Sequence, residues 1–224
     1  MKKLALVVLC GLVLSSCATL MAADNCCKTC CKKAQPLFGE NLSAADYDPA
    51  VWKLNEQGEL TSVKDSAIWT KEKIGDCKIS LEYKLSSHSN AGILIKCSDK
   101  QNWIPNTIEI QLLDDAGTQP NYHGNAAFYG YQAPTKVLTK PAGEWNQIEI
   151  TCKGTKIWVK LNGELVNEMD MAEWKDCKKG PNGTDIEGKF QGKALADSDS
   201  VGYVGLQGLH GKAALMYRNL KIEK

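Results

Sequence analysis

Strict alternation of apolar and polar residues over 107–113 is the pattern that most constrains the fold. It predicts a β-strand, because successive side chains of a strand point to opposite faces. The apolar face suits the core of a packed sheet. The polar face places the carboxylate of Glu109 and the carboxamide of Gln111 about 7 Å apart along the strand. Two interpretations of this polar face are open: a solvated outer surface, or the lining of a binding groove.

Short runs of the same kind recur along the chain, separated by turns rich in Gly, Asn and Pro. We expect strands at residues 58–61, 67–70, 79–85, 92–97, 145–152, 156–161, 202–207 and 213–223. Segments 114–143 and 165–200 carry few strand signals, and long loops of this kind are often functional. No stretch shows sustained helical periodicity. The sequence therefore predicts an all-β, two-sheet antiparallel jelly-roll sandwich with long loops.

The first segment has the pattern of an export signal. Two lysines precede an apolar run at residues 4–14, which is too short to span a bilayer. The run ends in Leu-Ser-Ser-Cys, which looks like a bacterial lipobox. It predicts a signal peptide at 1–16, lipidation of Cys17, and a lipoprotein anchored in the periplasm or on the cell surface. Cleavage near Ala22 or Ala23, giving a soluble secreted or periplasmic protein, is the alternative.

Cysteine usage fits an exported chain. Residues 17–35 form a Cys-rich polar tether, followed by the domain at 36–224. The tether's cluster from Cys26 to Cys31 favours local disulfides or surface attachment over a zinc site, because no second pair of ligands lies nearby. The cysteines of the domain could form two disulfides with three possible pairings, or remain buried thiols. They are Cys77, Cys97, Cys152 and Cys177.

The charge balance argues against nucleic-acid binding. The chain has 27 Lys and Arg residues against 26 Asp and Glu residues, a net charge of +1. Removal of residues 1–16 takes away two lysines and no acidic residue, which leaves a net charge of −1. A near-neutral chain whose only arginine is Arg218 lacks the basic patch that phosphate binding needs. We expect Arg218 to form a structural ion pair rather than to contact a substrate.

A series of short motifs follows in order from residue 37 to residue 220. The most informative are Asn90-Ala91-Gly92-Ile93, Ile108-Glu109-Ile110-Gln111, Pro141-Ala142-Gly143-Glu144-Trp145-Asn146, Leu161-Asn162-Gly163, Gly202-Tyr203-Val204-Gly205-Leu206-Gln207 and Tyr217-Arg218-Asn219-Leu220. In this order they resemble the bacterial domain of unknown function once numbered 1080, now called the 3-keto-disaccharide hydrolase family. The resemblance covers essentially the whole domain and implies a concanavalin-like sandwich. Two departures are Lys96, where the family often has Arg, and His210, which lies in Gly-Leu-His-Gly rather than Asp-His-Gly.

The resemblance implies cleavage of glycosides whose C3 hydroxyl has been oxidised to a ketone by a separate sugar 3-dehydrogenase. The ketone acidifies the C2 proton. A base can remove that proton, the C1 substituent then leaves by β-elimination, and water adds later to complete a net hydrolysis. Such a site needs a base near C2, a cation or donor at the enolate oxygen, and an acid at the leaving oxygen.

For this chemistry we expect Glu109 to be the base, Lys96 the cation and His210 the acid. Substrate contacts are expected from Gln111, Glu82, Asn90, Tyr129, His123, Trp103 and Gln207. A divalent metal ion held by Glu109, Glu82 or His210 is another way to polarise the ketone. Strands close in sequence tend to be neighbours, so Lys96 and Glu82 should flank Glu109.

Two other functions are open. The first is a non-catalytic carbohydrate-binding module on the cell surface, since the same fold serves lectins and a fold does not determine function. The second is a surface interaction or structural lipoprotein. A carboxylate, a cation and a histidine that converge on one groove would favour the enzyme, whereas an aromatic platform without them would favour binding.

Overall fold

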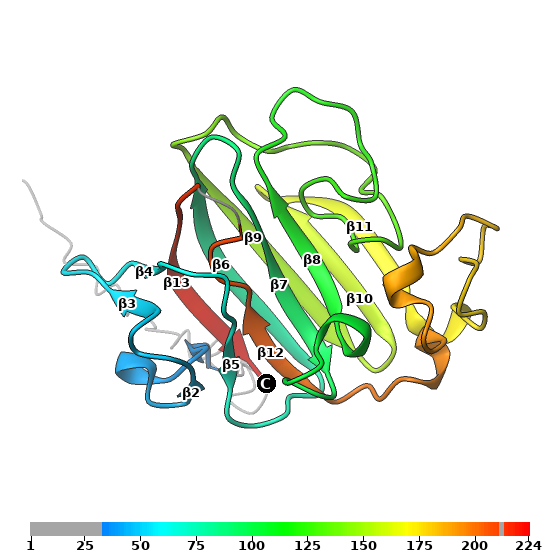
Figure 1. The fold of residues 1–224 in the computed structure, drawn as a ribbon, viewed down its shortest axis with the longest axis horizontal. Helices are drawn as coiled ribbons and strands as arrows, with labels where there is room; N and C mark the ends of the chain where they lie inside the picture. The colour runs from blue at the N-terminus through cyan, green and yellow to red at the C-terminus, as the bar shows by residue number, and fades with distance from the viewer. Residues whose placement is uncertain (1–32, 211–212) are drawn as a thin grey trace, which may run out of the picture. The chain divides into compact units, whose positions relative to one another are not determined.

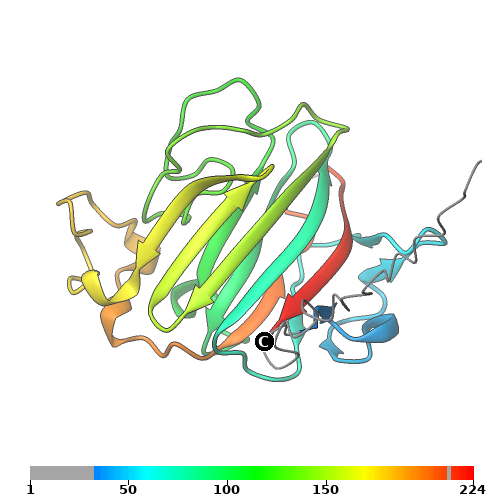
Figure 2. The ribbon, with the colours of Figure 1, turned by 180° about the vertical axis from the view of Figure 1, so that it is seen from behind.

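Two antiparallel β-sheets pack face to face in the domain (Figures 1 and 2). The structure is a computed structural model and describes residues 33–210 and 213–224. The larger sheet has the strand order β11-β10-β9-β6-β13-β4-β3, with β1 paired to β13. The smaller sheet has the order β2-β5-β12-β7-β8.

The strands are short and the loops carry only 3-10 helices. The larger sheet contains β1 (Gln35–Pro36), β3 (Trp52–Leu54), β4 (Leu60–Ser62), β6 (Cys77–Leu85), β9 (Trp145–Lys153), β10 (Lys156–Leu161), β11 (Glu164–Asp170) and β13 (Leu215–Glu223). The smaller sheet contains β2 (Ala45–Asp46), β5 (Ile68–Thr70), β7 (Asn90–Cys97), β8 (Ile108–Leu113) and β12 (Tyr203–Leu206). The 3-10 helices are η1 (Glu40–Leu42), η2 (Ile104–Asn106), η3 (Met171–Glu173), η4 (Gly188–Phe190) and η5 (Leu195–Asp197). The described residues contain no α-helix, as the lack of helical periodicity predicts.

The core lies between the two sheets and follows the predicted alternation. On β6, Ile79, Leu81 and Tyr83 are each at most 1 % exposed, while the residues between them are only partly buried. On β8, Ile108 and Ile110 belong to the same buried cluster. Removal of this apolar surface from water is the main force that holds the sheets together.

Several predictions concern residues that the structure does not describe. The signal peptide at 1–16, the lipidated Cys17 and the cluster from Cys26 to Cys31 all lie outside the described ranges. They stay predictions. Within the described ranges, no helix has the length and the apolar character needed to cross a bilayer.

Residues 165–170, which the sequence assigns to a long loop, belong to strand β11 (Glu164–Asp170). Its pairing with β10 shifts register between Val159 and Lys160. The shift places Val166 and Asn167, which follow each other in sequence, both in buried positions. The strand therefore lacks the period of two by which strands are recognised.

The expected neighbourhood of β6 and β7 is also wrong. The turn at residues 86–89 crosses from one sheet to the other, so β6 pairs with β9 and β13 while β7 pairs with β8 and β12. The polar faces of these two strands therefore belong to different sheets.

All four cysteines of the domain are free thiols. Cys77 and Cys152 are buried directly opposite each other on β6 and β9. Cys97 packs with Trp69 and Leu94 on the outer side of the smaller sheet. These three cysteines are buried thiols, as the second alternative predicts, whereas Cys177 is a partly exposed thiol.

A buried polar network attaches the loop at 114–143 to both sheets. Asn125 is 1 % exposed, and its side chain donates to Tyr83 Oη at 2.7 Å and to Thr139 Oγ1 at 2.9 Å. Its backbone N–H donates to Asp115 Oδ2 at 2.7 Å, and its Oδ1 accepts from the Leu113 N–H at 3.2 Å. Asn125 thus joins β6, β8 and the loop.

We expect Asn125→Ala to lower the free energy of unfolding by about 1–3 kcal/mol, because it leaves buried donors and acceptors without partners. Urea denaturation measures this change. The matched control is Asn102→Ala at an exposed position. Equal stability of the two variants would show that the network does not hold the loop.

Candidate active site

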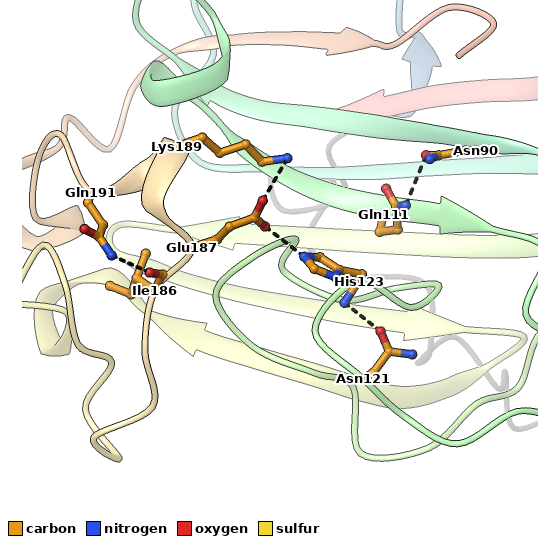
Figure 3. A network of polar contacts seen from close by, with 8 residues as sticks. All are labelled: Asn90, Gln111, Asn121, His123, Ile186, Glu187, Lys189 and Gln191. Carbon is orange, nitrogen blue, oxygen red and sulfur yellow. Dashed lines mark hydrogen bonds and ion pairs between the residues drawn. The ribbon is translucent and has the colours of Figure 1, made fainter. Parts of the chain in front are cut away.

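Glu109 and Gln111 lie on the face of β8 opposite the core, as predicted, yet both are buried. Glu109 is 8 % exposed and Gln111 is 1 % exposed, so the solvated-surface interpretation is wrong. Gln111 Nε2 lies 3.1 Å from Asn90 Oδ1 (Figure 3). With the amide oxygen and nitrogen of Gln111 exchanged, its nitrogen donates to Glu109 Oε1 at 3.3 Å.

Gly92 on the neighbouring strand β7 leaves the space that Glu109 occupies. A Cβ atom on Gly92 would lie 2.3 Å from Glu109 Oε1 and 2.6 Å from its Cγ. Both distances are far inside van der Waals contact. The carboxylate therefore rests on the backbone of β7, in a place that a side chain at position 92 would fill.

Burial raises the pKa of the Glu109 carboxyl from 4.5 to about 7. Desolvation is the largest cause, since removal from water disfavours the charged form. The carboxylates of Asp65 and Glu187 act in the same direction, while the positive charges of Lys189 and His210 oppose it. Near neutral pH the group is therefore divided between its acid and base forms, which suits a proton acceptor.

A pocket of about 160 Å³ opens onto Glu109. Six of the expected site residues line it: Asn90, Trp103, Glu109, Tyr129, Gln207 and His210. Four residues that the sequence did not single out complete the lining: Asp65, Ile104, Lys189 and Phe190. The pocket thus combines a carboxylate, a cation and a histidine with aromatic walls.

His210 lines this pocket, as the proposed acid must. Its Nδ1 lies 2.5 Å from Asp65 Oδ2, and Gln207 Nε2 donates to the other oxygen of Asp65 at 3.4 Å. A backbone bridge between His210 and Asn90 attaches the loop to the start of β7. A carboxylate on Nδ1 fixes the orientation of the ring and leaves Nε2 available to a ligand.

The cation of the pocket is Lys189, on η4. Its Nζ lies 3.3 Å from Glu187 Oε1 and 4.4 Å from the ring centre of Tyr129. Figure 3 shows Glu187 between Lys189 and His123, whose Nε2 lies 2.8 Å from Glu187 Oε2. Desolvation alone would raise the pKa of Glu187, but the bonds to His123 and Lys189 hold it below its usual value. His123 thus acts behind the pocket, through Glu187.

The free edge of β8 is covered by the loop that carries Tyr129. The Tyr129 N–H donates to the Glu109 carbonyl at 2.9 Å, and the Gln111 N–H donates to the Ala127 carbonyl at 3.0 Å. The Ala126 N–H donates back to the Gln111 carbonyl at 2.8 Å. These bonds fix the loop beside the carboxylate.

Lys96 does not lie in this pocket, contrary to our expectation. Tyr203 pairs with Cys97 but Gly205 pairs with Leu94, so β7 carries one extra residue. This β-bulge, at which Lys96 has a φ of 57°, interrupts the alternation and turns the side chain away from Glu109. Lys96 Nζ instead donates to the Ser200 carbonyl.

Glu82 does not flank Glu109, so this prediction is also wrong. It lies on β6 in the larger sheet, where its Oε2 accepts from Arg218 Nε at 2.7 Å and its Oε1 accepts from Asn219 Nδ2 at 2.8 Å. The predicted structural ion pair of Arg218 is therefore confirmed, with Glu82 as its partner. Neither residue contacts the pocket.

The residues that the sequence analysis missed lie on loops. Asp65 lies between β4 and β5, and Glu187 and Lys189 lie in the segment at 171–200. The sequence predicts only a long loop there, because loop residues carry no periodicity that assigns them to a face. No pattern in this one sequence selects Lys189 among the neighbouring lysines.

The metal alternative has no ligand set. Among residues 33–210 and 213–224, no three His, Cys, Asp or Glu side chains are grouped so that they could hold a metal ion. Glu82, one of the expected ligands, lies on the other sheet from Glu109.

Comparison with known proteins identifies the family. The sequence profile of the 3-keto-alpha-glucoside-1,2-lyase-like domain matches residues 33–223. The chain belongs to this family. This confirms the resemblance seen in the motifs. A comparison with curated proteins finds no match.

Solved structures of similar proteins support the same fold and a role in carbohydrate chemistry. A putative glycosyl hydrolase from Parabacteroides distasonis is 39 % identical, with a TM-score of 0.82 over 86 % of this chain and 99 % of that chain. A second one from the same organism is 19 % identical, with a TM-score of 0.65 over 86 % and 94 %. A carbohydrate-binding module from Bacillus subtilis shares the fold at 12 % identity, with a TM-score of 0.51 over 81 % and 96 %. The jelly-roll sandwich is confirmed, and family and structures together indicate a carbohydrate-active hydrolase domain.

We expect the raised pKa of Glu109 to make the wild type less stable than Glu109→Gln as the pH rises. Below about pH 4.5 the carboxyl is protonated in both folded and unfolded chains. Between there and about pH 7 only the unfolded chain ionises, so wild type should lose about 3 kcal/mol relative to the variant. Urea denaturation across this range measures the difference, with the exposed Glu144→Gln as control. A difference that stays constant with pH would contradict the burial of the charge.

Proposed function

We propose that the protein cleaves glycosides whose C3 hydroxyl has been oxidised to a ketone. The observation that carries the proposal is a buried carboxyl with a pKa of about 7 in the same pocket as Lys189 and His210. A C–H bond next to a ketone is weakly acidic, so its cleavage requires a base, a charge near the ketone oxygen and an exit for the leaving group. The pocket holds one group for each task.

Glu109 is the base in this mechanism. As the carboxylate it takes the C2 proton, and the electrons of the C–H bond move to the C3 oxygen to form an enolate. Lys189 replaces Lys96 in the role of the cation, because its ammonium group faces the pocket and lowers the free energy of negative charge there. Glu187 and the ring of Tyr129 hold the ammonium group in place.

His210 is the acid that completes the elimination. As the enolate re-forms the ketone, a C1–C2 double bond forms and the C1–O bond breaks. The imidazolium Nε2 gives its proton to the departing oxygen, and Asp65 stabilises the charged ring beforehand. Addition of water to the double bond, with a proton on C2 and hydroxide on C1, gives the net hydrolysis. Asn90, Gln207 and Trp103, which line the pocket, remain as proposed contacts to the sugar, while the buried Gln111 contacts Asn90 instead.

The substrate chemistry requires a preceding oxidation. A sugar 3-dehydrogenase must supply the ketone, since no group described in the pocket oxidises a hydroxyl. We propose that both steps take place outside the cytoplasm, with the protein exported and anchored through Cys17. The support for export is the sequence pattern of residues 1–17.

A carbohydrate-binding module remains the second candidate. The feature that favours it is a cluster of three tilted rings, in which the ring centre of His123 lies 4.3 Å from that of Tyr122 and 4.7 Å from that of Tyr129. Release of sugar from a 3-keto-disaccharide by the purified protein decides between the two functions. Binding of the 3-keto-disaccharide without release of sugar would favour the carbohydrate-binding module.

We expect Glu109→Gln to lower kcat by about 10²–10⁴, because the amide cannot accept the C2 proton. Lys189→Met should lower it by about 10²–10³, since the enolate loses its cation. The exposed Glu144→Gln and Lys193→Met serve as matched controls. In the wild type, kcat/KM should rise with pH through about 7 as Glu109 ionises. Full activity of Glu109→Gln would overturn the mechanism.

Gly92→Ala tests the position of the base. The added methyl group would fall on the Glu109 carboxylate and displace it, at a cost in stability of about 1–3 kcal/mol. We expect kcat to fall with little change in KM. Gly192→Ala is the control, because a Cβ there meets no atom within 4 Å. Unchanged turnover of Gly92→Ala would mean that the carboxylate acts from another position.

A further inference from the structure

A second hollow lies beside the active site, and the proposed reaction does not use it. Its volume is about 360 Å³, which falls within the size of small-molecule sites. Three segments form its walls: the loop after β8, the edge strand β11 and the segment that follows β11. The residues that matter here are Tyr122, Tyr131, Glu168, Glu173 and Trp174.

Tyr131 brings an unpartnered hydroxyl to this hollow. The residue is 5 % exposed, and its ring packs at 5.6 Å from Trp174 and 5.2 Å from Phe190. Its hydroxyl makes no hydrogen bond within the described part of the chain, and burial alone raises its pKa. Among the described residues, the hydroxyl is not one of the fully enclosed side-chain atoms that lack a partner, so it is open to the hollow. A ligand in the hollow can therefore form a hydrogen bond with it.

A row of aromatic rings links the lining of the hollow to the lining of the active-site pocket. Tyr122, which is 44 % exposed, packs against His123 at a tilt of 46°, and His123 packs against Tyr129 at a tilt of 37°. Tyr129 and Phe190 both line the pocket above Glu109. Tyr122 is thus the lining residue of the hollow through which these ring contacts lead to the pocket.

The negative charge of the hollow favours neutral sugars over acidic ones. Three carboxylates line it, from Glu168, Asp170 and Glu173. Only Asp170 has an ion-pair partner among the described residues, Lys156 at 3.9 Å. Carboxylates accept hydrogen bonds from hydroxyl groups but repel other anions. The lining therefore suits hydroxyl-rich, uncharged units and opposes uronic acids.

We propose that this hollow is a subsite for a further, uncharged sugar unit of an oligosaccharide whose 3-keto unit occupies the active site. The proposal rests on the proposed function and narrows its substrates to neutral oligosaccharides longer than a disaccharide. The Tyr131 hydroxyl bonds to a sugar hydroxyl, Tyr122 stacks on a ring, and Glu168 and Glu173 accept from its hydroxyl groups.

The kinetic test compares a neutral 3-keto-disaccharide with a neutral 3-keto-tetrasaccharide. Tyr131→Phe should lower kcat/KM for the tetrasaccharide about three- to tenfold, the effect of one hydrogen bond, and leave the disaccharide unchanged. Tyr122→Ala should act in the same selective way. Tyr47→Phe, far from the hollow in the segment after β2, is the control. An equal effect of Tyr131→Phe on both substrates would overturn the subsite.

Calorimetric binding of the unoxidised tetrasaccharide separates the two proposals, because it needs no turnover. If Tyr131→Phe weakens this binding while no 3-keto-glycoside is cleaved, the subsite stands and the proposed function fails. If the disaccharide is cleaved but neither variant changes binding or kinetics of the tetrasaccharide, the subsite fails and the proposed function stands. A tetrauronate that binds as tightly as the neutral tetrasaccharide would overturn the selection by charge.

Discussion

The structure of the site depends on one buried carboxyl, that of Glu109, which extends from β8 over the backbone of β7 at Gly92. Burial of an ionised group costs free energy unless charges or hydrogen bonds offset it. The absence of a side chain at Gly92 makes room for it, and Lys189 and His210 supply compensating positive charge. The surrounding loops can therefore be understood by what they bring to this one group. The stability of the fold and the chemistry proposed for the site are coupled at the same atom.

The two-sheet architecture followed from alternation in the strands. Side chains such as Ile79, Leu81 and Tyr83 repeat with a period of two, and that period alone places them in a core. The period of two does not show which strands pair with each other. Whether the turn at 86–89 joins neighbours or crosses between sheets depends on contacts with strands far away in sequence, including β13. Glu82 was misplaced for that reason.

The site could be predicted where its residues lie on strands or in motifs of the family. The alternation of β8 predicts Glu109 and Gln111, and the family motif at residues 90–93 predicts Asn90. Lys96 shows the limit of this reasoning, because one extra residue reverses the face of a side chain and the bulge is visible only when β12 is paired with β7. Lys189 and Asp65 could not be predicted, since a loop reaches the site through its path in space.

The loop that covers β8 has a second consequence, for association between chains. β8 is the last strand of the smaller sheet, and an uncovered last strand offers a row of donors and acceptors to a strand of another molecule. Residues 126–129 occupy that row through their bonds to Glu109 and Gln111. The segment that positions Tyr129 therefore also blocks the addition of a strand at this edge. Sequence changes that loosen it should promote self-assembly as well as disturb the pocket.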